Sequence, residues 1–141
     1  MYIKDFAASI ATAQENCAIV SKIESAFGCS LSPECKKVLS LNEDGDIFDD
    51  DDIRRLMSTS EILSASQELH VDFHTVGIVP VVDCGDNDFA AYNFKKGKWC
   101  KYNIVENCMF FEKETFAELW SESQGEASSG PFLACRLVCP V

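Results

Sequence analysis

The fold is decided by residues 76–105, which read VGIVPVVDCGDNDFAAYNFKKGKWCKYNIV. β-Branched and aromatic residues fill three runs, and two clusters of turn-forming residues separate them, 83–88 and 95–97. This pattern predicts strands at Val76 to Val82, Phe89 to Phe94 and Lys98 to Val105. Because such short connections join antiparallel neighbours, we expect a mainly antiparallel sheet.

The residues after this stretch extend the sheet and close it. A turn at Asn107 precedes a short strand from Cys108 to Phe111, and 113–120 has the apolar spacing of a helix. Residues 121–130 are rich in Ser, Gly and Glu, which is typical of a flexible linker. We expect 131–141 to form an additional strand or a tail.

The residues before the sheet predict three helices. The first runs along an apolar stripe from Phe6 through Cys17 to Phe27 and ends at Gly28. A second begins after Ser32 and ends near Leu41, and a third follows the capping box formed by Ser58 and Glu61. We therefore predict an α+β fold with N-terminal helices packed on the sheet and a closing C-terminal helix. The sequence indicates a single domain over 1–141, with its core at about 15–120.

Length and composition exclude several classes of protein. The chain has 141 residues, of which 47% are hydrophobic and 25% charged, as in a compact globular domain. No apolar run approaches the ~18 residues that cross a bilayer, and the N-terminus lacks the pattern of a secretory leader. We therefore expect a cytoplasmic protein without a membrane span.

The charge balance indicates the kind of partner. The chain has 12 Lys and Arg against 23 Asp and Glu, a formal net charge of -11. Such a surface repels phosphate backbones, so we expect no nucleic acid and favour a basic protein as partner. The pattern leaves the oligomeric state open.

The eight cysteines have two interpretations. An even number in a small chain fits a disulfide framework, but no secretory leader accompanies it. Several cysteines also stand where an apolar residue fits the local period. We therefore predict mostly reduced thiols that act as small buried hydrophobic residues.

Motifs for chemistry are absent. The cysteine spacings do not match structural zinc pairs, and His70 and His74 lack the glutamate of a zinc-protease helix. Neither a nucleophile motif nor a phosphate-binding glycine loop is found. We expect no catalytic residue, no metal site and no cofactor, so the protein is not expected to be an enzyme. A redox or metal-responsive role for Cys135 and Cys139 with another thiol is a weaker alternative.

Acidic residues gather between the second and third predicted helices. The segment does not fit an EF-hand, because Asp49 and Arg55 take the sixth and twelfth positions counted from Asp44. We therefore predict an exposed loop that binds a partner through six aspartates: Asp44, Asp46, Asp49, Asp50, Asp51 and Asp52.

Two further groups of residues have both a functional and a structural interpretation. The lysines around the predicted hairpin could bind an anion, although alternation on an exposed hairpin explains them equally well. Trp99 and Trp120 could contact a partner, but core packing is favoured because both lie in apolar-periodic segments. The four lysines are Lys95, Lys96, Lys98 and Lys101.

Four stretches in order resemble motifs of the SUKH superfamily. They are Leu31 to Leu39 followed by Asn42, Arg55 to Leu63, Gly77 to Val82, and Phe116 to Trp120. They are similar to the family's "Leu-Pro-x-Asp/Glu" opening, its "Arg-Leu-Leu-Ser" helix start, its "Ile-Pro-Ile" strand and its closing helix. The resemblance covers about residues 15–120. Glu43 and Cys35 depart from it, standing where the family commonly has a glycine and an aromatic residue.

This resemblance implies a function as well as a fold. Bacterial SUKH members are largely immunity proteins, so it implies a non-enzymatic protein that binds and neutralises a cognate toxin, for example a nuclease. The alternative is a general interaction or regulatory scaffold module, as in the family's fungal regulator of cell-wall synthesis. The family motifs transfer no binding residues.

Overall fold

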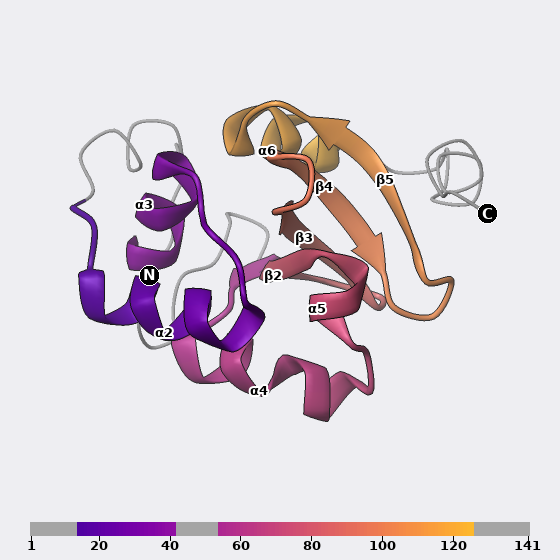
Figure 1. Ribbon diagram of the computed structural model, residues 1–141. Helices are drawn as coiled ribbons and strands as arrows, with labels where there is room; N and C mark the ends of the chain where they lie inside the picture. Colours follow the sequence, from indigo (N-terminus) through magenta and orange to yellow (C-terminus); the bar gives the residue numbers. More distant parts are fainter. Residues whose placement is uncertain (1–13, 42–53, 126–141) are drawn as a thin grey trace.

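The computed structural model describes residues 14–41 and 54–125, and of 121–125 only the backbone. The described elements are, in chain order, α2 (Cys17–Phe27), α3 (Pro33–Leu41), β1 (Arg55–Leu56), α4 (Thr59–Leu69), α5 (Phe73–Val76), β2 (Ile78–Gly85), β3 (Asp88–Asn93), β4 (Lys98–Asn103), β5 (Cys108–Lys113) and α6 (Phe116–Gly125). Helices precede and follow one antiparallel sheet, so the predicted α+β class is confirmed (Figure 1).

The sheet is an antiparallel meander in which each strand pairs with the next. Its order is β1-β2-β3-β4-β5. Asp86 and Asn87 connect β2 to β3 with φ of 52° and 68°, the left-handed conformation that tight hairpins require. The predicted strands are confirmed, although β2 extends three residues into the predicted turn. The two-residue strand β1 was not predicted, because it is too short to show alternation.

Helices cover both faces of the sheet. Trp99 and Tyr102 on β4 are three residues apart and therefore point to opposite faces. Trp99 packs against Phe116 of α6 at 4.9 Å between ring centroids, whereas Tyr102 packs against Phe73 of α5 at 6.1 Å. Figure 1 shows α2, α3 and α4 gathered on one side of the molecule, with β5 on the opposite side. Consequently β3 and β4 are buried along almost their whole length, and β2 is buried over 78–82.

The first predicted helix is shorter than its apolar stripe suggested. The side chain of Asn16 accepts hydrogen bonds from the N–H groups of Ala18 and Ile19, which fixes the start of α2 at Cys17. Cys17 is therefore exposed, and its predicted place inside the buried stripe is wrong. Residues 1–13 lie outside the described part of the chain. At the other end, Gly28 terminates α2 in the left-handed conformation as predicted.

The second and third predicted helices are confirmed, including their caps. The hydroxyl of Ser32 accepts a hydrogen bond from the Cys35 N–H at the start of α3. Ser58 and Glu61 form the predicted capping box at the start of α4.

Two helical segments differ from the prediction. Val76, predicted as the first strand residue, ends the short helix α5, because Asp72 caps this turn and Gly77 ends it at φ 93°. Residues 121–125 were predicted to be linker, but they continue α6. Ser, Glu and Gln are compatible with a helix, and no glycine or proline stands before Gly125. None of the described helices is long and apolar enough to cross a membrane.

Candidate functional site

The predicted acidic site lies outside the described residues. Asp44, Asp46, Asp49, Asp50, Asp51 and Asp52 all belong to 42–53. The described chain stops at Leu41, the end of α3, and resumes at Arg54. Arg54 is buried, donates to the Trp120 carbonyl oxygen at 3.0 Å and lies 3.5 Å above the Trp120 ring. The acidic segment is therefore followed directly by a residue fixed against α6.

The lysines of the β3–β4 hairpin are largely neutralised by the protein itself. The ammonium of Lys96 lies 3.4 Å from the Glu112 carboxylate, and that of Lys98 lies 3.3 Å from Glu114. Lys101 is buried, 4.0 Å from Asp88, and Lys95 donates to the Thr75 carbonyl at 2.8 Å. These contacts favour the structural interpretation of the hairpin lysines over an anion-binding patch.

The tryptophans belong to the core, as favoured by the sequence. Trp99 is 1% exposed and Trp120 is 7% exposed. The indole N–H of Trp99 donates to one carboxylate oxygen of Glu34 at 2.8 Å, and the Phe116 N–H donates to the other at 3.0 Å. We call Glu34, Trp99 and Phe116 the Glu34 junction, because the carboxylate joins α3 to β4 and α6.

A second carboxylate has a structural role at the start of α4. The guanidinium of Arg55 donates to both oxygens of Glu61, at 2.6 and 2.7 Å. This pairing, with further hydrogen bonds from Ser58, lowers the pKa of Glu61 to about 2, although partial burial opposes the shift.

The described cysteines are mostly reduced. Five are free, of which Cys35 and Cys100 are buried, Cys29 and Cys84 are half-buried, and Cys17 is exposed. The expectation of a reduced thiol is wrong for Cys108, which is disulfide-bonded to none of these five. The spacing of the cysteines could not show this pairing. Cys135 and Cys139 lie outside the described residues.

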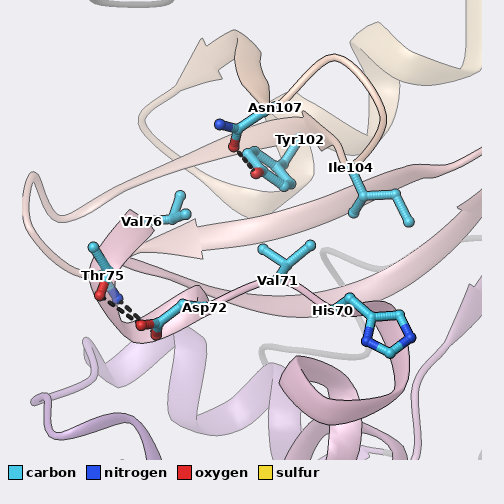
Figure 2. Close-up of a pocket in the computed structure, with 8 residues that line it drawn as sticks. All are labelled: His70, Val71, Asp72, Thr75, Val76, Tyr102, Ile104 and Asn107. Atoms are coloured by element: carbon cyan, nitrogen blue, oxygen red, sulfur yellow. Dashed lines mark hydrogen bonds between the residues drawn. The ribbon is translucent and has the colours of Figure 1, made fainter.

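One pocket opens between α4, α5 and the β4–β5 turn. Its volume is about 260 Å³, and we call it the α5 pocket. Its lining residues are His70, Val71, Asp72, Thr75, Val76, Tyr102, Ile104 and Asn107. Figure 2 shows Val71 and Val76 between two hydrogen-bonded pairs, Tyr102 with Asn107 and Asp72 with Thr75. The pocket therefore has apolar walls and a polar rim.

Two side chains, exposed Lys95 and buried Asn103, support the two walls of this pocket. The stem of Lys95 packs closely against Gly77, the residue that ends α5. A Cβ atom added to Gly77 would come within 2.5 Å of the Lys95 Cδ. The opposite wall depends on buried Asn103, whose side-chain oxygen accepts from the N–H groups of Val105 and Glu106. This turn leaves Val105 69% exposed beside the pocket.

Asp72 supplies negative charge at the rim. Its carboxylate accepts from the Thr75 hydroxyl at 2.8 Å and from the Thr75 N–H at 3.2 Å. These hydrogen bonds lower the pKa of Asp72 below its ordinary value, so it is ionised at neutral pH. None of the eight lining residues is a lysine or an arginine.

The two histidines do not form a metal site together. His70 lines the α5 pocket, whereas a ring nitrogen of His74 lies 2.5 Å from the Phe27 carbonyl oxygen. Both histidines are exposed. Over residues 14–41 and 54–120, whose side chains the structure describes, no three His, Cys, Asp or Glu side chains gather as metal ligands.

Comparison with known proteins returns no match. No family model fits the chain, and neither a curated protein nor a solved structure matches it. Its residues and their geometry are therefore what a functional proposal rests on.

Proposed function

We propose that this chain is a SUKH-type immunity protein, which binds and neutralises a cognate toxin in the cytoplasm without catalysing a reaction. The described architecture supports the proposal, since the resemblance implies N-terminal helices, an antiparallel sheet and a closing helix. The chain has these elements in that order.

The positions of the resembling residues are consistent with this proposal. Glu34 joins three elements at the Glu34 junction, and Glu61 closes the capping box of α4. Residues 78–82 lie in β2, which pairs with both β1 and β3. Residues that hold the elements together are those that a shared fold preserves, whatever partner each protein binds.

The observation on which the proposal depends most is the distribution of charge. Residues 42–53 hold seven acids and no base, whereas Lys96 and Lys98 of the hairpin pair with Glu112 of β5 and with Glu114 just after it. The net charge of -11 is therefore concentrated in one segment of the chain. Such a concentration attracts a basic protein and accelerates its association.

The state of the thiols favours binding over catalysis. Burial raises the pKa of Cys29 and Cys84 to about 11 and that of Cys100 to about 12. A protonated thiol is a poor nucleophile. The exposed His74, moreover, is engaged with the Phe27 carbonyl.

The test is association with a toxin domain encoded next to the gene for this chain. Replacing Asp49 to Asp52 together with Asn should slow association about tenfold at low salt, because electrostatic steering weakens. The difference should shrink at high salt, where charges are screened. Stopped-flow or surface-binding kinetics measures both rates.

A matched variant separates this segment from net charge. Its four changes to Gln remove exposed acids elsewhere: Glu15, Glu68, Glu114 and Glu118. We expect it to associate at close to the unmodified rate. Equal slowing by both variants would show that the segment is not the interface. If no toxin gene lies beside the gene for this chain, the scaffold alternative is supported instead.

A further inference from the structure

We propose that the α5 pocket receives a lysine or arginine side chain of the partner protein. This goes further than the proposed function, and rests on it only in assuming that the ligand is a protein. None of the eight lining residues belongs to the acidic segment 42–53, since all of them lie between His70 and Asn107 in the sequence.

The shape of the pocket suits a long side chain with a polar end. Val71, Val76 and Ile104 are half-buried and offer apolar contact to a chain of methylene groups. A volume of about 260 Å³ admits such a stem but is small for a drug-sized molecule.

The polar atoms at the rim select a cation. The Asp72 carboxylate is ionised, and the amide oxygen of exposed Asn107, which accepts from the buried Tyr102 hydroxyl, lies at the opposite side of the pocket (Figure 2). Oxygen acceptors around an apolar stem bind an ammonium or guanidinium group, which has only donors. An anionic side chain would be repelled by Asp72.

The surroundings of the pocket fit a protein surface rather than a free amino acid. Val105 is the most exposed of the large apolar side chains that the structure describes. It stands beside two lining residues, Ile104 and Asn107, and is followed by the exposed acid Glu106. An apolar side chain with acids around it is complementary to a basic side chain flanked by apolar residues. Lys95, the cation in contact with α5, is occupied by the Thr75 carbonyl.

The test uses amide NMR shifts of the full chain on titration with Nα-acetyl-lysine amide at millimolar concentrations. We expect saturable shifts at residues 70–76 and 102–107. The Nε-acetylated analogue has the same stem without the charge, and should cause no saturable shifts.

Asp72→Asn is the matched variant, because asparagine caps a helix as well as aspartate but carries no charge. It should weaken binding of the lysine probe about tenfold, within the range of charge-assisted hydrogen bonds. Glu118→Gln removes one charge from α6, on the other face of the sheet, and should leave binding unchanged.

Three outcomes overturn the proposal: no saturable shift with the lysine probe, equal shifts with the acetylated analogue, or unchanged binding by Asp72→Asn. Because the probe is not the toxin, these results are independent of whether a toxin partner is found. Failure of toxin binding alone would contradict the proposed function, but not the preference of the α5 pocket for a basic side chain.

Discussion

Glu34 and Asp72 are both acidic side chains at helix starts, but their surroundings differ. The two oxygens of Glu34 accept hydrogen bonds from β4 and α6, more than 60 residues away in the chain. Asp72 accepts hydrogen bonds from Thr75, three residues later in the chain, and faces a pocket open to solvent. The Glu34 carboxylate is therefore engaged in contacts between elements of the fold, whereas the exposed Asp72 carboxylate is accessible to a ligand.

Residues that resemble a family motif are therefore different from residues that are accessible to a ligand. Glu34 belongs to a stretch that resembles a SUKH motif, and its role is structural. Asp72 belongs to none of the four stretches. Resemblance in short motifs thus reports how the elements are joined, and binding sites have to be found from surface geometry.

The strongest test of this contrast is the loss of an aromatic ring from the Glu34 junction. Trp99→Leu should lower the free energy of unfolding by about 3 kcal/mol, because it leaves a cavity and removes the indole donor. Val105→Ala, at the exposed side of the α5 pocket, should change it by less than ~0.5 kcal/mol. Urea unfolding followed by circular dichroism measures both. Similar losses in the two variants would contradict the assignment of the junction to stability and the pocket to binding.

A more specific test compares the two carboxylates directly. Glu34→Gln replaces one acceptor by a donor, so an N–H of Trp99 or Phe116 loses its partner, at a cost of about 1–3 kcal/mol. Asp72→Asn keeps the helix cap and should cost no more than ~0.5 kcal/mol. Chemical unfolding at pH 7 measures the loss of unfolding free energy in each variant. A larger loss for Asp72→Asn than for Glu34→Gln would contradict the comparison.

Glu61 gives the smallest effect and tests charge separately from capping. Its pKa is lowered to about 2 in the folded protein, so its charge stabilises the fold above pH ~4.5 and this contribution is lost as pH falls towards 2. Glu61→Gln preserves a capping-box residue but loses the ionic contact with Arg55. We expect a loss of about 1 kcal/mol at pH 7, since the side chain is 39% exposed and solvent screens the pair.

The pH dependence supplies the control for this variant. The difference in unfolding free energy between the wild-type chain and Glu61→Gln should disappear near pH 2. A difference that stayed constant from pH 7 to pH 2 would mean that geometry, rather than charge, accounts for the effect.

The fold was predictable where local residues determine it. Ser58 with Glu61, Ser32 with Pro33, and the hairpin turn 95–97 specify their own conformation through neighbours in the chain. The prediction failed where a single side chain interrupts a pattern. Asn16 starts α2 inside an apolar stripe, and Asp72 with Gly77 forms α5 at the edge of a strand-like run.

The α5 pocket could not be predicted from the sequence, because its walls come from segments about 30 residues apart. Asp72 looks like an ordinary cap, and Tyr102 like an ordinary strand residue. The one local signal was Val105, an apolar residue next to a turn. The acidic segment was conspicuous by composition alone, and the six aspartates predicted there stay a prediction.

The Glu34 junction also determines how this protein can be observed. The chain has two tryptophans, and both rings pack on Phe116, at 4.9 and 5.8 Å between centroids. Tryptophan emission therefore reports the environment between the sheet and α6, and is blind to Tyr102 at the α5 pocket on the other face. In a titration of the pocket, a constant tryptophan spectrum would verify that the fold is intact while the amide shifts follow the ligand.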